Sequence, residues 1–238
     1  MHDDNTWIPA SAAMTPVACS AFDPMFADAW TYLAEHPRQF GAALWTHVSL
    51  SASALAIAIA IAVPLGIWLA ETRRAALVAI NAANIGRTLP SLAVLALMMP
   101  LLGTGFTPAL FALTLLALPP ILLNTCTAIR QVDADIVDAA RGMGMTAMDL
   151  VRKVKLPIAL PVIFAGIRTA AIQVISGAVL AAYIGGGGLG DFITAGIAMM
   201  AVPQLLVGAI PATLLALGTD LLFGRLQRTM TPKGLRGG

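Results

Sequence analysis

The sequence predicts an all-α integral membrane protein with about five transmembrane helices. Hydrophobic residues make up 58% of the 238 residues and charged residues only 11%, whereas a soluble domain has about 45–50% and about 25%. The apolar residues also gather in uninterrupted runs long enough to cross a bilayer as helix. A soluble core could not bury so much apolar surface, so lipid must cover part of it.

Residues 1–43 are predicted to form an N-terminal segment outside the hydrocarbon core. The beginning of the chain is acidic and lacks both a basic region and a compact apolar stretch, so it does not read as a signal peptide. Residues 26–48 mix aromatic and charged side chains, a pattern typical of an interfacial helix that leads into the first span. Residues before about 23 read as a soluble tail.

The first span is predicted over residues 44–70. Trp45 and Trp68 lie near its two ends, where aromatic belts meet the membrane–water interface. At 1.5 Å per residue their separation is roughly 35 Å, close to the thickness of a bilayer. Pro64 is expected to kink this helix.

The next charge-free stretch, residues 88–129, must contain one turn. A single helix of that length would be roughly 60 Å long, about twice the hydrocarbon thickness. Glycine and proline residues between 100 and 108 supply the turn signal. The second span is therefore predicted over about 75–101 and the third over about 108–127.

Two further spans are predicted, at about 158–183 and 205–223, with a glycine-rich loop and a short helix between them. The transmembrane domain then covers residues 44–224, and residues 225–238 form a basic tail. In a five-span topology one side of the membrane carries nearly all basic residues, which places the N-terminus outside and the C-terminus in the cytoplasm. These basic residues are Arg73, Arg74, Arg130, Arg141, Arg152, Lys153, Lys155, Arg225, Arg228, Lys233 and Arg236.

The charged stretch at about 130–157 is then the largest cytoplasmic loop. Its apolar residues recur at steps of three and four, which predicts an amphipathic helix. Gly142 and Gly144 each cost about 1 kcal/mol in a helix interior, so they indicate a break between two short helices. Such a helix outside the membrane either lies on the headgroups or docks into another protein. The stripe consists of Ala139, Met143, Ala147, Leu150 or Val151, and Val154.

This loop resembles the EAA loop of ABC importer permeases, whose pattern reads E-A-A-x3-G-x9-I-x-L-P. Every spacing matches, with two conservative differences, Asp138 in place of Glu and Val154 in place of Ile. The resemblance implies a MetI-like permease fold in the bacterial plasma membrane. It also implies that the loop forms the helix that couples the chain to a separate ATPase. The implied coupling residues are Asp138, Ala139, Ala140, Gly142, Gly144, Val154, Leu156 and Pro157.

Residues 28–228 further resemble permeases of osmoprotectant importers, which carry glycine betaine, carnitine, choline or proline. Stretches such as IGRTLPSLAVLALMMPLLGTG carry this resemblance. It implies a cytoplasmic ATPase dimer that binds ATP-Mg, a second permease subunit, and a periplasmic or lipid-anchored substrate-binding protein. The chain itself is expected to bind no cofactor and to catalyse no reaction. Permeases for methionine, other amino acids or phosphonates share this fold and remain the alternative.

Polar residues inside the predicted spans are candidates for a translocation path. An arginine at the bilayer centre costs several kcal/mol, so it usually faces protein or water. The candidates are Arg87, Thr88, Ser91 and Asn124, with snorkelling or helix–helix hydrogen bonding as the alternative. An arginine suits the carboxylate of a zwitterion better than it suits a cation. Arg168 lies nearer the interface if its helix starts in the cytoplasm, and Asp220 is expected to be structural.

Other functions are less well supported. The stretch Gly185–Gly190 contains the letters of a dinucleotide-binding motif, but neither a preceding strand nor a suitably spaced acidic residue accompanies it. It is read as an outer gate, as a binding-protein contact or as a simple loop. No phosphate-binding P-loop occurs, a net charge of +2 does not suggest nucleic acid, and the histidines and cysteines lack metal spacing. A membrane scaffold that recruits a soluble partner remains a second alternative.

Overall fold

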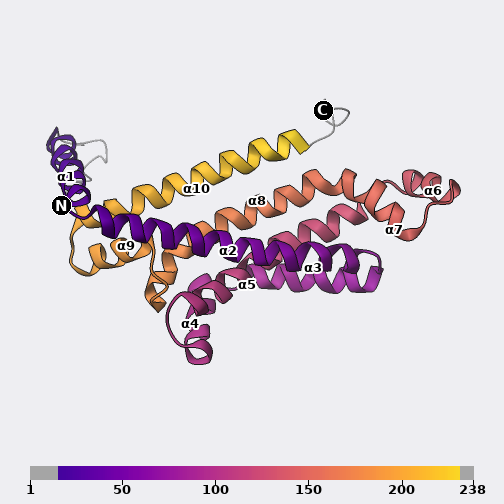
Figure 1. The fold of residues 1–238 in the computed structure, drawn as a ribbon, viewed down its shortest axis with the longest axis horizontal. Coiled ribbons are helices and arrows are strands. Elements are labelled where there is room, and N and C mark those ends of the chain that lie inside the picture. Colours follow the sequence, from indigo (N-terminus) through magenta and orange to yellow (C-terminus); the bar gives the residue numbers. More distant parts are fainter. Residues whose placement is uncertain (1–15, 231–238) are drawn as a thin grey trace, which may run out of the picture.

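The chain folds into long helices that run side by side (Figure 1). The computed structural model describes residues 16–230, and no β-strand occurs in that range. Four helices are long and apolar enough to cross a membrane, or five spans if the bent pair α3–α4 counts as one, so the prediction of an all-α protein with about five spans is confirmed. Predictions for residues 1–15 and 231–238 lie outside the described residues. The spanning helices are α2 (Pro37–Ala70), α5 (Phe106–Arg130), α8 (Leu156–Leu180) and α10 (Val202–Met230).

Helix α2 begins at Pro37, earlier than the predicted start of the first span. Proline is favourable at the start of a helix because its missing N–H would have no partner there. The interfacial helix predicted over 26–48 is therefore divided at His36 between α1 (Pro16–Glu35) and α2. Trp45 and Trp68 are 74% and 71% exposed, which is consistent with the predicted aromatic side chains at the two membrane interfaces.

The second span is broken, in contrast to the single helix predicted over 75–101. Helices α3 (Arg73–Thr88) and α4 (Ser91–Leu102) meet at an angle of 93°. Both Leu89 and Pro90 adopt extended backbone conformations between them. The physical reason is Pro90, since a residue that precedes proline is driven out of the helical region.

Helix α5 lies at the centre of the bundle between α2 and α8. Small residues let the backbones approach, as in many membrane helix interfaces. On α2 the fully buried residues recur every four positions, at Leu50, Ala54, Ala58 and Ala62. Farther along α2, Gly66 faces Thr125, and a Cβ added to this glycine would lie only 2.8 Å from the threonine side chain. Helices α2 and α5 therefore pack closely through small residues, mainly alanine and glycine.

An ion pair joins α8 to α10. Arg168 donates from Nε to Asp220 Oδ1 over 2.6 Å and from Nη2 to Oδ2 over 2.8 Å. Gly224 gives the guanidinium room, because a Cβ at this position would lie 3.2 Å from Arg168 Nη1. Bidentate pairs of this kind fix geometry as well as charge. The structure therefore assigns Arg168 and Asp220 a helix-packing role, as expected for Asp220.

We expect Asp220→Leu and Arg168→Met each to lower the thermal unfolding midpoint of the purified protein by several degrees. Each single change leaves an uncompensated charge within a span, which is costly. The double variant removes both charges and should recover part of the loss. As a control, Asp149→Asn breaks the exposed 2.8 Å pair with Lys153 and should change the midpoint little. The role would be contradicted if the double variant lowered the unfolding midpoint by as much as the two single changes added together.

The two ends of the bundle carry different structures (Figure 1). At one end, a 3₁₀ turn (Ala181–Ile184) and the glycine-rich loop lead into the short helix α9 (Leu189–Ala198). At the other end lie α6 (Ala134–Gly142) and α7 (Ala147–Asp149), which continues through a π-helical turn (Leu150–Lys155) into α8. A 2.8 Å salt bridge between Lys155 and Glu71 ties this end to the end of α2.

Candidate functional site

A polar cavity opens where the second span is broken. Its volume is about 340 Å³, and residues of the α3–α4 break, of α5 and of α8 line it. Arg87 lies in the last turn of α3, where the helix dipole favours a positive charge, and Ser91 is the first residue of α4. Gln173 and Ser176 face them from α8. We call this space the α3–α8 cavity.

The side chain of Arg87 makes no hydrogen bond or ion pair with any described residue. A guanidinium offers five N–H donors in a planar fork that fits a carboxylate. An unpaired arginine at membrane depth is expensive unless water or a ligand reaches it. The hydroxyl of Ser91, the hydroxyl of Ser176 and the amide of Gln173 add neutral polar groups to the same cavity. The cavity is therefore suited to a small polar molecule that carries an anionic group.

The structure brings together only two of the four predicted path residues. Arg87 and Ser91 line the α3–α8 cavity. Thr88 turns its hydroxyl to its own helix and donates to the Ile85 carbonyl over 2.7 Å. Asn124 donates to the Pro120 carbonyl over 2.8 Å and packs against Gly166, where a Cβ would lie 2.6 Å from the Asn124 Cβ. The contacts of Asn124 support the alternative of a helix-packing role.

Gln173 and Ser176 were not predicted from the sequence. They are three positions apart in an otherwise apolar part of α8, so they lie on the same side of the helix. Two polar residues three positions apart within an apolar span are the sequence pattern from which they could have been predicted.

The charged stretch forms two helical pieces separated by a turn, which confirms the predicted break. Asp133 caps α6 by accepting a hydrogen bond from the Asp135 backbone N–H over 2.9 Å. Helix α6 ends at Gly142, and Gly144 has a φ of +82°, a left-handed conformation that favours glycine. The hydroxyl of Thr146 then accepts a hydrogen bond from the backbone N–H of Asp149 at the start of α7. We call residues 134–155 the α6–α7 segment.

The α6–α7 segment exposes apolar side chains outside the membrane-spanning helices. Ile136, Met143 and Met148 are 44%, 71% and 60% exposed. The predicted stripe is not continuous, because Leu150 is buried against neighbouring turns whereas Met143 is exposed. Exposed large apolar side chains in a charged surface are typical of a docking site.

The predicted coupling residues occupy different positions along this part of the chain. Ala140 is buried, and its carbonyl accepts a hydrogen bond from the Met145 N–H. Asp138 is exposed and lies 3.7 Å from Arg141. Leu156 and Pro157 open α8. Val154 and Leu156 are half-buried, and Ala139, Gly142 and Gly144 are exposed.

The glycine-rich loop at the opposite end packs against α2. Gly188 has a φ of +96°, and a Cβ at this position would lie 3.3 Å from the ring of His47. Partial burial near the start of α9 raises the pKa of the Asp191 carboxyl. No group of three or more histidine, cysteine, aspartate or glutamate side chains that could hold a metal occurs among residues 16–230.

A bundle of spans with a partly polar cavity at a broken span and an exposed segment beyond one end is typical of a membrane transport subunit. The chain matches the family described as binding-protein-dependent transport system inner membrane component over residues 40–233. The chain belongs to this family, and the predicted resemblance to ABC importer permeases is confirmed. Members are transport permease subunits rather than enzymes, and such permeases work with a separate ATPase and a substrate-binding protein.

Curated relatives extend over most of the chain. A carnitine transport permease of Listeria monocytogenes is 43% identical over 87% of this chain and 94% of its own length. A glycine betaine/carnitine/choline transport system permease of Bacillus subtilis is 44% identical over 80% of this chain and 88% of its own length. An osmoprotectant import permease of Salmonella typhimurium is 39% identical over 86% of this chain and 98% of its own length.

Solved structures support the predicted fold. An inward-facing structure of the MetNI methionine ABC transporter has a chain that aligns with a TM-score of 0.73. The alignment covers 83% of this chain and 99% of that chain, at 24% identity. At this identity the likeness shows the fold alone.

Proposed function

We propose that this chain is the permease subunit of an ABC importer for compatible solutes such as glycine betaine, carnitine, choline or proline. The observation that carries the proposal is the identity of 39–44% to permeases of carnitine, choline and osmoprotectant systems over most of their length. The unpaired Arg87 in a cavity lined with neutral polar groups supports it. A zwitterion can place its carboxylate on the guanidinium and leave its ammonium group to the neutral side chains.

The proposed topology has the N-terminus outside and the C-terminus in the cytoplasm. Residues 1–43 then form the outer and interfacial segment, residues 44–224 the transmembrane domain, and residues 225–238 a basic cytoplasmic tail. The distribution of basic residues supports this direction. In this orientation the α6–α7 segment faces the cytoplasm, and α9 with the glycine-rich loop faces outward, where a gate or a binding-protein contact is needed.

The proposed assembly contains a second permease, identical or homologous, and a cytoplasmic ATPase dimer. A periplasmic or lipid-anchored substrate-binding protein completes it. The pathway lies at the two-fold interface between permeases, and the α3–α8 cavity contributes one wall. Asp138, Ala139, Ala140, Gly142 and Gly144 belong to the coupling segment, which Val154, Leu156 and Pro157 join to the first turns of α8. The partner ATPase binds ATP-Mg, and its closure moves the two coupling segments so that the spans alternate between inward-facing and outward-facing states.

Uptake by the reconstituted complex tests the proposed substrate class. Vesicles that contain both permeases, the ATPase and the binding protein are loaded with ATP and given radiolabelled glycine betaine, carnitine or methionine. We expect uptake of betaine or carnitine that depends on ATP. Uptake of methionine alone would show that the chain serves the alternative solute class.

A further inference from the structure

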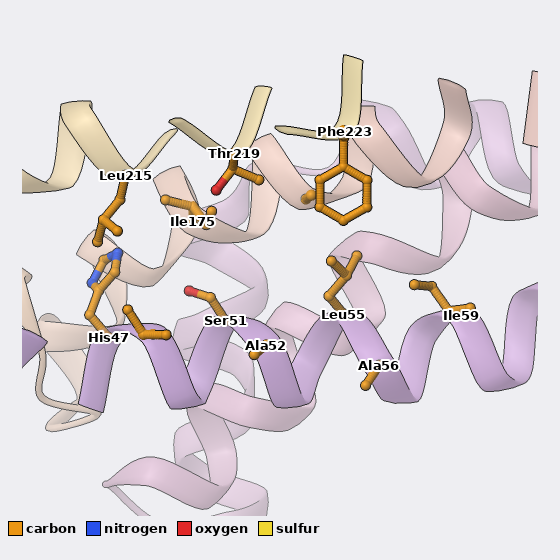
Figure 2. Close-up of a pocket in the computed structure, with 12 residues that line it drawn as sticks. His47, Ser51, Ala52, Leu55, Ala56, Ile59, Ile175, Leu215, Thr219 and Phe223 are labelled. Atoms are coloured by element: carbon orange, nitrogen blue, oxygen red, sulfur yellow. The ribbon is translucent and has the colours of Figure 1, made fainter. Parts of the chain in front are cut away.

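A second cavity lies between α2 and α10, away from the α3–α8 cavity. It has a volume of about 330 Å³, and α8 forms its floor. Both α2 and α10 pack on α8 but hardly on each other, so a groove remains between them. Leu55 and Ile59 of α2 and Leu215 and Phe223 of α10 form its apolar walls. Figure 2 shows the side chains of α2 and α10 pointing toward one another across this α2–α10 groove.

One end of the α2–α10 groove is polar, and its polar groups lack partners. His47 and Ser51 are 1% and 5% exposed. No hydrogen bond of standard geometry joins the His47 ring or the Ser51 hydroxyl to another described residue. The Ile175 backbone lies close enough to interact with the His47 ring. Both side chains point into the groove (Figure 2). Buried polar groups nearly always have a partner, so these two are suited to a ligand that supplies one.

The position of the groove matches the depth of one membrane leaflet. The polar end lies two residues from the exposed Trp45, at the level of the aromatic belt. From His47 to Ile59 the lining follows α2 for twelve residues, which is roughly 18 Å, or slightly more than half the hydrocarbon thickness. A ligand that fits must therefore be polar at the interface and apolar for the depth of one leaflet.

We propose that the α2–α10 groove binds one acyl chain of a membrane phospholipid, whose ester oxygens accept hydrogen bonds from His47 and Ser51. A neutral imidazole and a hydroxyl each provide one donor for these oxygens. The volume of about 330 Å³ is at the lower end of the range for ligand pockets. This suits one acyl chain better than a helix of a second protein, which is about 10 Å across. The bound chain would complete the packing between α2 and α10 and satisfy the unpartnered polar groups.

Photolabelling of the assembled complex tests this binding. The complex is placed in vesicles of phosphatidylethanolamine and phosphatidylglycerol that contain a trace of phosphatidylglycerol with a diazirine in its acyl chain, and labelled peptides are mapped by mass spectrometry. We expect labelling to concentrate on residues 47–59 and 215–223. Ala52→Phe, which fills the groove from an exposed position of α2, should reduce this labelling several-fold relative to other spans of the same molecule. Ala60→Phe, at an exposed position of α2 outside the groove lining, should not.

A separate experiment tests the role of His47 and Ser51 at the polar end of the groove. It measures how much phospholipid stays bound to the complex when it is purified in detergent. We expect His47→Leu with Ser51→Ala to lower the phospholipid that co-purifies with the complex, and His47→Gln, which keeps an N–H donor, to retain it. Equal labelling in the wild-type protein and in Ala52→Phe would overturn the proposal, because it would mean that only bulk lipid is labelled. A disulfide between two copies that carry Ala52→Cys would also overturn it, because a second copy would then occupy the groove.

Discussion

The Met143→Asp/Met148→Asp double variant is expected to lose its ATPase during purification while the permease itself remains folded. Both methionine side chains are largely exposed and lie outside the membrane-spanning helices, so the substitution leaves no cavity in the core. If the segment docks into the ATPase, each aspartate must bury a charge in an apolar site. The loss of such an anchor typically costs about 2 kcal/mol or more, which is more than tenfold in affinity for each residue.

The experiment measures the ratio of ATPase to permease in the affinity-purified complex and the ATP-dependent uptake of solute. Met200→Asp is the matched control, because Met200 is 88% exposed and lies in the turn between α9 and α10 at the other end of the bundle. It should retain the ATPase. If the double variant kept the wild-type ratio of subunits, the coupling role of the α6–α7 segment would be wrong.

Arg87→Gln is expected to abolish most uptake of a zwitterionic solute without loss of assembly. The Arg87 side chain has no hydrogen bond or ion pair within the described residues, so replacing its guanidinium should not weaken the fold. Hydrogen bonds to charged groups contribute about 1.5–3 kcal/mol, which corresponds to roughly 10- to 150-fold in rate or affinity. Uptake of glycine betaine and carnitine should fall by this factor.

Choline separates the proposed role of Arg87 from a general defect, because it carries the same quaternary ammonium group but no carboxylate. Its uptake should be unchanged or higher in Arg87→Gln, since a positive charge has been removed from the cavity. Thr88→Ala changes the neighbouring residue, whose hydroxyl bonds only to its own helix, and should transport all three solutes normally. Equal losses for betaine and choline would show that Arg87 does not recognise the carboxylate.

Much of the fold was predictable because a bilayer imposes simple rules. Charge-free runs of sufficient length predicted the spans, and Gly142 with Gly144 predicted the break in the α6–α7 segment, where Gly144 adopts positive φ. The break between α3 and α4 was missed because hydropathy averages over a window and does not register the backbone restriction that Pro90 imposes. The break therefore follows from the backbone conformation at one proline, which the composition of the stretch does not reveal.

The candidate cavity was only half predictable. Arg87 and Ser91 stood out as polar residues in an apolar run, but Gln173 and Ser176 reach the cavity from a helix far along the chain. The ion pair between Arg168 and Asp220 likewise joins residues 52 positions apart, and a single sequence does not report such contacts. The packing of Asn124 against Gly166 likewise depends on how α5 and α8 meet, so the sequence could not decide between a path residue and a helix-packing residue.

The uninterrupted passage of α7 through the π-helical turn into α8 has a mechanical consequence. From Ala147 to Ile184 the chain is one continuous helical stretch of 38 residues. It begins in the α6–α7 segment and carries Gln173 and Ser176 toward its other end. The distance from Ala147 to Gln173 is roughly 39 Å, so a tilt of about 10° moves one point relative to the other by about 7 Å. If this stretch moves as one body, a modest tilt imposed through the α6–α7 segment shifts Gln173 and Ser176 by a distance comparable to the size of a small solute.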